Sequence, residues 1–416
     1  MHAIGIIAEY NPFHKGHAYQ AERARQLGNA DVVIAVMSGH YTQRGEIAIF
    51  DKWSRAQAAV LSGVDLVLEL PAVFVVRSAQ YFATGGVRLL QSLGIVNQLS
   101  FGAEDAEMES LNAAALGMEN AAVTEQLKLN LRNGKTYAAA MSHALVMGGH
   151  ATSNFIISPN NILGVEYLRA LKKHAPGIAP LPIQRIGSAY HSTEIVGEYS
   201  SASAIRQALM NCPSFPPSIS AVLPFTTLEM TSKLFATGWA PTDYSRLDIA
   251  ILSKIRRMTD EQLQGVPELS EGLENKLRKA ANEAGSTTEL LALLKSKRYP
   301  AARLKRILAH LLLGTAPEQI TIFDQSGPLY ARVLALNNRG RAALRAISKH
   351  AEIPVITKTT AHFNSRTYHS GIFTPLQAML AYDIAATDIF TLCLPDPANR
   401  KGGIDFSRSA IHVPDA

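Results

Sequence analysis

Two histidines with a lysine and a glycine between them, His14-Lys15-Gly16-His17, follow the first apolar segment of the chain. Gly16 has no Cβ, so the backbone there could approach a ligand closely. A helix that begins at this point would direct its free N–H groups and the positive end of its dipole into the loop, which favours an anion such as a phosphate. The imidazoles could then donate hydrogen bonds to oxygens that gain charge as a phosphoanhydride breaks.

The position of this motif decides between its possible meanings. A pattern this short also occurs by chance on protein surfaces, and two histidines can form half of a metal site. Here it follows a predicted strand over residues 3–8 and opens a predicted helix over residues 17–27. Open α/β sheets bind ligands at such strand ends. The sequence therefore predicts nucleotide binding at His14 and His17.

A second group of polar side chains lies much later in the chain, where Ser200, Ser201 and Ser203 precede an amphipathic segment that contains Arg206. Hydroxyls in this position cap a helix. The same hydroxyls and the free helix N–H groups could also hold phosphate oxygens, which the planar guanidinium of Arg206 could reach. Plain capping explains this segment equally well when it is taken alone. Its occurrence after the histidine motif favours a second phosphate-binding element.

The elements that must position these residues alternate between strand and helix. Near-continuous apolar strands separated by helical patterns predict an α/β domain with a Rossmann-like, doubly wound parallel sheet, whose ligand lies at the carboxyl ends of the strands. The predicted strands are residues 3–8, 31–37, 65–70, 98–102 and 178–185. The predicted helices are residues 17–27, 52–61, 79–93, 107–131, 136–147 and 162–174.

Prolines at 213, 216, 217 and 224 interrupt this pattern and predict a connector. We therefore expect three parts: a catalytic domain over residues 1–212, a mainly helical, basic region over 213–395, and a polar, loosely ordered tail over 396–416. Within the second part, residues 301–313 read as a basic helix, and residues 330–337 and 353–357 read as strands with a helix over 341–350 between them.

The composition is that of a folded protein, with 47% hydrophobic and 18% charged residues in a chain of 416. It contains no long apolar run that could span a membrane, and its two cysteines form no metal or disulfide pattern, so we expect a cytoplasmic protein with no membrane partner. Between residues 295 and 349, eleven Lys and Arg residues are opposed only by Glu318 and Asp324. Such a stretch indicates either a polyanion-binding surface or a solvated helix face.

Longer strings of residues resemble one family. The histidine motif and the later Ser/Arg helix start are typical of the nucleotidyltransferase superfamily. Within it, Glu9-Tyr-Asn-Pro-Phe-His-Lys-Gly-His17, Met37-Ser-Gly-His-Tyr-Thr-Gln-Arg-Gly-Glu46, Asp65-Leu-Val-Leu-Glu-Leu-Pro71, Phe101-Gly-Ala-Glu104 and Ser158-Pro-Asn-Asn-Ile-Leu-Gly164 resemble the tRNA(Met) cytidine acetate ligase family. The resemblance implies that ATP activates acetate as acetyl-adenylate. The acetyl group then passes to the exocyclic amine of the wobble cytidine in elongator tRNA(Met), which gives N4-acetylcytidine.

The resemblance also implies roles for individual residues. It gives His14, His17 and Arg206 catalytic roles, and it implies Mg²⁺ bound with ATP but no metal site in the protein. Arg185 would end its strand pointing at the phosphates, Asn161 would hold ribose or base edges, and Gly102 would leave room for the nucleotide. The implied ATP loop consists of Ile7, Ala8, Glu9, Tyr10, Asn11, Pro12, Phe13, His14, Lys15, Gly16, His17, Ala18, Tyr19 and Gln20.

Two other activities fit parts of the sequence. An adenylyltransferase acting on a small phosphorylated cofactor precursor would share the histidine motif, but it would have no use for the basic C-terminal half. A non-catalytic RNA-binding protein with a vestigial nucleotide fold would not need His14, His17 and Arg206. Near the predicted site, the loop over residues 43–46 is expected to contact substrate, whereas Lys52 and Arg55 are expected to decorate a solvated helix face.

Overall fold

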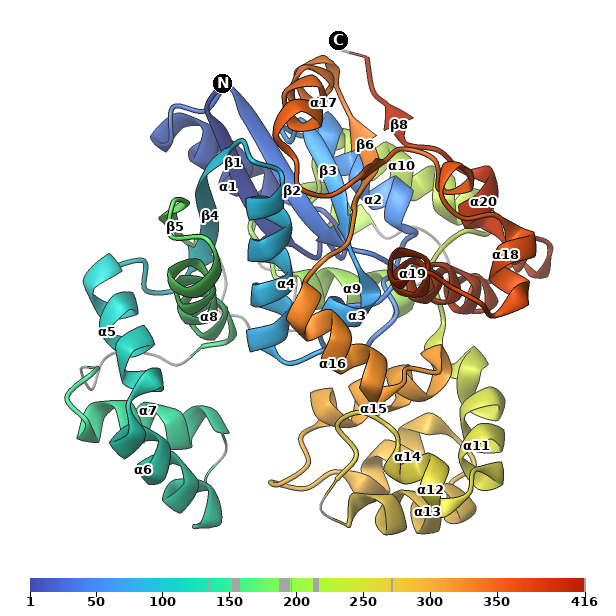
Figure 1. Cartoon of the computed structure of the whole chain (residues 1–416). Coiled ribbons are helices and arrows are strands. Elements are labelled where there is room, and N and C mark those ends of the chain that lie inside the picture. The colour runs from blue at the N-terminus through green and yellow to red at the C-terminus, as the bar shows by residue number, and fades with distance from the viewer. Residues whose placement is uncertain are drawn as a thin grey trace.

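A computed structural model describes residues 1–133, 135, 137–151, 158–186, 195, 197–211, 217–270 and 272–414. One eight-stranded sheet forms its centre, with the strand order β5-β4-β1-β2-β3-β6-β7 and with β8 paired to β6 (Figure 1). Strands β1 to β5 are mutually parallel, and β6 runs antiparallel to β3. The predicted α/β, doubly wound fold is confirmed, with a mixed rather than purely parallel sheet.

The five predicted strands of the first half lie within one or two residues of the strands in the structure. Their sequences are rich in Val, Ile and Leu because helices cover both faces of the sheet. Helices α1 and α2 pack on one face, and α4, α8 and α17 pack on the other. The strands are β1 (Ala3–Ala8), β2 (Val32–Ser38), β3 (Leu66–Leu70), β4 (Val96–Ala103), β5 (Ala179–Gln184), β6 (Ala331–Leu336), β7 (Val355–Ile356) and β8 (Ile411–His412).

The helices of the first half are α1 (Lys15–Leu27), α2 (Lys52–Leu61), α3 (Ala72–Val75), α4 (Ala79–Ser92), α5 (Met108–Glu119), α6 (Ala121–Arg132), α7 (Tyr137–Met147), α8 (Pro159–His174) and α9 (Ala202–Asn211). The prediction of a single helix over residues 107–131 is wrong. Asn120 breaks it into α5 and α6, because the side chain of Asn120 accepts a hydrogen bond from the N–H of Ala122 and so caps α6.

The second half contains a group of helices that we call the helical lobe, α11 to α16 (Figure 1). They are α11 (Asp248–Arg257), α12 (Asp260–Gln264), α13 (Leu273–Glu283), α14 (Thr287–Leu294), α15 (Ala301–Leu313) and α16 (Pro317–Ser326). The remaining helices are α10 (Phe225–Ala236), α17 (Asn338–His350), α18 (Ser365–Ser370), α19 (Pro375–Leu392) and α20 (Ile404–Ser407), together with short 3-10 turns at Pro217–Ala221, Tyr244–Leu247, Thr359–Ala361 and Pro397–Asn399. The predicted strands near 330–337 and 353–357 form β6 and β7 of the main sheet.

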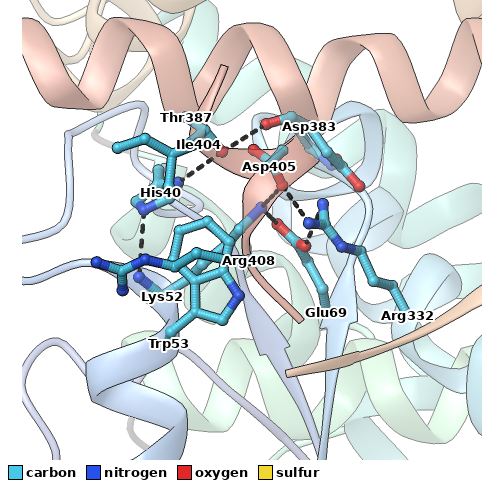
Figure 2. Close-up of polar contacts among 12 residues, drawn as sticks. His40, Lys52, Trp53, Glu69, Arg332, Asp383, Thr387, Ile404, Asp405 and Arg408 are labelled. Atoms are coloured by element: carbon cyan, nitrogen blue, oxygen red, sulfur yellow. Dashed lines mark hydrogen bonds and ion pairs between the residues drawn. The ribbon is translucent and has the colours of Figure 1, made fainter. Parts of the chain in front are cut away.

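Lys52 is fully buried in a charge cluster, so the prediction that it decorates a solvated face is wrong. Its Nζ lies 2.8 Å from Glu69 Oε1 and 3.0 Å from Asp405 Oδ1. Arg332 on β6 pairs with the same two carboxylates (Figure 2). Arg55 is buried as well, and its guanidinium donates to the carbonyl oxygens of residues that end β1 and β2.

The tail is ordered over the residues described, contrary to the prediction. Its Asp405 belongs to the charge cluster, and β8 pairs with β6. Sequence composition could not reveal this, because the partners of Asp405 lie far away along the chain. The division at residues 212 and 395 stays a prediction, although β6 and β7 place part of the second segment in the central sheet.

The basic stretch over residues 295–349 is one cluster in sequence but not in space. On α15, Lys305 Nζ lies 2.5 Å from Glu46 Oε1, and Arg306 pairs with Glu268 at 2.8 Å. Arg332 is in the buried cluster. The four cations of α17 are exposed on a helix that starts beside Asp65, at the amino end of β3 and away from the strand ends that carry the histidine motif. Lys305 and Arg306 are thus paired with carboxylates, and whether the basic helix 301–313 binds a polyanion stays a prediction.

Candidate active site

His14 and His17 build the start of α1 through their own side chains. His14 is the N-cap residue, and its Nδ1 accepts a hydrogen bond from the N–H of Gly16 at 3.1 Å. The Nδ1 of His17 accepts in turn from the N–H of His14 at 3.3 Å. The two rings stack with centroids 3.8 Å apart. Because both Nδ1 atoms act as acceptors, the proton of each neutral ring resides on Nε2, which leaves an N–H donor directed away from the cap.

Both imidazoles are neutral at physiological pH. Burial and, to a smaller extent, the nearby Arg185 and Arg206 lower the pKa of His14 to about 3. Burial, His14 and Arg185 likewise hold the pKa of His17 well below its ordinary value. The site therefore offers two fixed, uncharged donors, which suits an oxygen whose negative charge grows during a reaction.

The structure gives a further reason for a glycine at position 16, which the sequence did not show. A Cβ at this position would lie 2.9 Å from Cε1 of His14. Because the His14 ring folds back over the first turn of the helix, a larger residue at position 16 would shift that ring, so glycine is favoured for packing as well as for ligand approach.

A small, partly open cavity lies beside the histidines. It lies between β1 and β4, where the strand order of the sheet reverses and where doubly wound folds bind ligands. Its lining comes from α1, the ends of β4 and β5, and the segment before α9. The lining residues are His14, Gly16, His17, Tyr19, Gln20, Gly102, Ile183, Gln184, Arg185, Ile186, Tyr199, Ser200 and Ser201.

Arg206 joins the second motif to the first. Its Nη1 donates to the carbonyl oxygen of Asn11 at 2.8 Å, and its Nη2 donates to Ser203 Oγ at 3.2 Å. Ser201 Oγ accepts from the N–H of Ala204 at 3.1 Å and so caps α9. Capping and phosphate binding are thus compatible here, because Ser200 and Ser201 also line the cavity. Arg206 is close enough to His14 to affect its pKa.

Arg185 reaches the cavity over Gly102. A Cβ on Gly102 would lie 3.3 Å from Arg185 Cγ, so a larger residue would displace the arginine. The Glu104 carboxylate orients this corner: its Oε1 lies 3.7 Å from Arg185 Nε, and it also accepts from Ser158 and Asn160. The strings Phe101–Glu104 and Ser158–Gly164 therefore meet in space.

Asn161 is completely buried and does not line the cavity. Its Oδ1 accepts from the N–H groups of Glu104 at 2.9 Å and Asp105 at 3.1 Å, which fixes the turn after β4. Its contact with ribose or base, expected from the resemblance, stays a prediction.

The remaining residues of the predicted ATP loop support the histidines. Ile7 and Ala8 end β1, and Pro12 and Ala18 flank the cap. The Tyr10 and Phe13 rings are buried against His17, with centroids 4.9 and 5.5 Å from it. Asn11 Oδ1 accepts from the N–H of Ile49, and Lys15 pairs with Glu198 at 2.6 Å. Tyr19 and Gln20 line the cavity.

Sequence reasoning missed Tyr199, Ile183, Gln184 and Ile186 as lining residues. Ile183 and Gln184 end β5, and the carboxyl end of a strand neighbouring β4 was a signal that could have identified them. Tyr199 directly precedes the Ser200 motif, and its ring contacts that of Tyr19 with centroids 6.2 Å apart.

Comparison with known proteins agrees with this geometry. The sequence profile of the HIGH nucleotidyl transferase family matches residues 1–405. A protein of Syntrophomonas wolfei named tRNA(Met) cytidine acetate ligase is 38% identical over 99% of each chain. The chain belongs to the tRNA(Met) cytidine acetate ligase family. The protein of that name from Caldanaerobacter subterraneus is 40% identical and covers 99% of this chain and 100% of its own.

Solved structures extend the family match to three dimensions. The structure of Thermotoga maritima TmcAL without ligand has a TM-score of 0.90 to this chain at 30% identity, and each chain is covered completely. The structure of the same protein bound with alpha-thio ATP has a TM-score of 0.88. Family membership thus includes the helical lobe as well as the sheet. Among the described residues, no helix is both long and apolar enough to cross a membrane.

Proposed function

We propose that this protein is an ATP-dependent acetate ligase that converts acetate to acetyl-adenylate and transfers the acetyl group to the wobble cytidine of elongator tRNA(Met). The observation that carries the proposal is the convergence of His14, His17 and Arg206 beside one cavity at the switch point of the sheet. The full-length match to proteins named for this activity supports the choice of substrates.

The first step needs positive charge and fixed donors rather than a general base, because acetate is already ionised at neutral pH. One acetate oxygen forms a bond to the α-phosphorus while the bond from phosphorus to pyrophosphate breaks, and pyrophosphate leaves with the electron pair. We assign the Nε2–H groups of His14 and His17 to the oxygens that gain charge in this step. Arg185 and Arg206 would hold phosphate oxygens through their guanidinium groups.

The proposed ATP loop runs over residues 7–20, with Gly102, Asn161 and Arg185 as further nucleotide contacts. Mg²⁺ would arrive bound to the ATP phosphates and neutralise the leaving pyrophosphate. The donors at the cavity agree with this, since they are imidazoles, guanidinium groups and hydroxyls. Among the described residues, no group of three or more His, Cys, Asp or Glu side chains could hold a metal ion.

The RNA would be bound by the region over residues 213–395. The cations of α11 are better placed for this than those of α15. Lys254 and Arg257 are exposed and have no hydrogen bond or ion pair within the ranges the structure describes. With Arg246 and the exposed side chain of Ile249 they line a shallow hollow that contains no acidic residue. Such a combination suits phosphates and the apolar faces of ribose and bases.

The activity is tested by incubating the purified chain with ATP, Mg²⁺, radiolabelled acetate and an elongator tRNA(Met) transcript. We expect acid-precipitable label in the RNA and one AMP released per acetyl group. The matched control is the same transcript with uridine in place of the wobble cytidine, which should take up no label. Label that appears equally in both transcripts, or no label with a folded transcript, would contradict the proposal.

A further inference from the structure

Glu9 is a carboxylate beside the histidine motif that the acetate-activation step leaves unused. It directly follows β1, and its carbonyl oxygen accepts from Arg55 Nη1 at 2.6 Å. Its Oε1 accepts from the N–H of Gln43 at 2.6 Å. Gln43 is held in turn by Nε2, which donates to the carbonyl oxygen of Arg77 at 2.8 Å. Both ends of the Glu9 residue are therefore fixed, and the direction of its carboxyl group is set by the backbone of the loop after β2.

Only one oxygen of this carboxylate is occupied. Within the described residues, no protein group donates a hydrogen bond to Oε2, and no cation lies within ion-pair distance of Glu9. Glu46, a carboxylate of the loop after β2, is instead paired with Lys305 at 2.5 Å. A side chain that served only to anchor the loop would need one acceptor oxygen, which a glutamine would supply equally well. The free oxygen and the negative charge call for another explanation.

The charge environment keeps the Glu9 carboxylate basic. Burial raises the pKa of Glu9, whereas the Gln43 hydrogen bond, Arg206 and Arg44 oppose the increase. Arg206 also lowers the pKa of His14, so its guanidinium lies near both Glu9 and the histidine motif. The lining of the nucleotide cavity comes from α1, the ends of β4 and β5 and the segment before α9, and it does not include Glu9, although Glu9 lies within the proposed ATP loop.

The β2 loop that holds the Glu9 carboxylate lies next to the helical lobe, which is part of the region that we propose binds the RNA. The loop after β2, whose Gln43 binds Glu9, also contains Glu46, which binds Lys305 on α15, and Gly45, which packs so closely on α15 that a Cβ would lie 2.5 Å from the N atom of Arg306. The helical lobe thus adjoins the β2 loop directly. An acceptor carried by RNA on that lobe would approach the site from the β2 loop, which holds the Glu9 carboxylate through Gln43.

We propose that the Glu9 carboxylate binds the exocyclic amino group of the target cytidine and acts as the general base of acetyl transfer. This inference rests on the proposed function. A carboxylate is the side chain that accepts hydrogen bonds from cytosine N4. In the step, the N4 nitrogen forms a bond to the acetyl carbonyl carbon. The bond from that carbon to the AMP oxygen breaks, AMP leaves with the electron pair, and the proton of the amine passes to Oε2 of Glu9.

The test separates the two half-reactions. Activation is measured as acetate-dependent exchange of labelled pyrophosphate into ATP without RNA. Transfer is measured in a single turnover with tRNA and preformed acetyl-adenylate. Glu9→Gln retains the acceptor for the Gln43 N–H but removes the base. We expect its transfer rate to fall by about 10²–10⁴, the range of general base catalysis, and its exchange rate to fall by less than tenfold.

Controls distinguish a base from a structural residue. Glu22→Gln removes an equal charge from the exposed face of α1, outside the cavity lining, and its transfer rate should stay within tenfold of the wild type. Glu9→Asp keeps the charge at a shorter reach and should retain more transfer than Glu9→Gln. The wild-type transfer rate should rise with pH and level off above the raised pKa of Glu9, and Glu9→Gln should lack this rise.

Two results would overturn the inference: a Glu9→Gln enzyme that transfers within tenfold of the wild type, or one whose exchange and transfer rates fall by equal factors. The second result would make Glu9 part of the nucleotide site only. If Glu9→Gln does not fold, equal exchange and transfer losses in Glu9→Asp would overturn it instead. Absence of acetate-dependent exchange in the wild type would refute the proposed function itself.

Discussion

Replacing Asp405 by asparagine should strongly destabilise the protein, because it leaves two buried cations, Lys52 and Arg332, with only one carboxylate to balance them. Asp405 is fully buried, and its carboxylate binds both Lys52, at 3.0 Å, and Arg332. Glu69 supplies the only other carboxylate that pairs with these cations within the described ranges. Asparagine has nearly the same size, so no cavity forms and the effect reports the charge alone.

The magnitude follows from the burial of the cluster. Two unit charges 4 Å apart attract by about 4 kcal/mol at the effective dielectric constant found for protein sites. Breaking a buried pair by removing one partner lowers the free energy of unfolding by about 3–5 kcal/mol. We expect this loss for Asp405→Asn. The double variant Lys52→Met, Asp405→Asn restores charge balance between Glu69 and Arg332, so its loss should be clearly smaller than the sum of the two single losses.

Urea unfolding followed by tryptophan fluorescence suits this prediction. Trp53 and Trp239 are the two tryptophans of the chain, and Lys52 Nζ lies 4.9 Å from the Trp53 ring. The control is Asp260→Asn, which breaks the exposed pair with Arg278 at 2.7 Å and should change stability by less than about 1 kcal/mol. An Asp405→Asn protein within 1 kcal/mol of the wild type would refute the reasoning, as would additive losses in the double variant.

Three further predictions concern the site and the RNA surface. His17→Ala should reduce acetate-dependent pyrophosphate exchange by about 10²–10³, as for other lost oxyanion donors, while gel-shift affinity for tRNA changes less than threefold; equal losses in both assays would contradict the assigned role. Because the pKa of His14 is lowered to about 3 and that of His17 is also depressed, both rings stay neutral as pH falls from 8 to 6. The exchange rate should therefore show no decrease caused by histidine protonation in this range. A decrease centred near pH 6.5 would contradict this. Charge reversal at Lys254 and Arg257 should weaken tRNA binding and flatten the slope of log affinity against log salt by about two charges. The same reversal at Lys349 on α17 should leave both quantities unchanged, and an equal effect at that position would move the RNA surface away from α11.

Much of the catalytic half could be predicted from the sequence because its signals are local. Buried parallel strands read as short apolar runs, which is why the segment from Val32 to Ser38 was found within one residue. The spacing of His14 and His17 places both rings on one turn of helix. Arg206 was placed at the site by its motif, and its hydrogen bond to Asn11 joins the two motifs in the structure.

Charges were predicted less well, since their environment depends on partners distant in sequence. Lys52 read as a solvated residue, yet its partner Asp405 lies 353 positions away. Lys305 read as part of an RNA-binding face, yet Glu46 on the β2 loop occupies it. Neither pairing leaves a trace in the local pattern, because a lysine in an amphipathic helix has the same neighbours whether it meets water or a carboxylate.

The sequence by itself determined the order of strands and helices, the two phosphate-type motifs and the resemblance to a ligase family, because these depend on residue types and short spacings. The tertiary structure alone decided which charges are buried, that the last residues of the chain complete the central sheet, and that Glu9 has one carboxylate oxygen free beside Arg206. These properties arise when segments hundreds of residues apart come into contact, and the energy of a charge is set by what surrounds it in space.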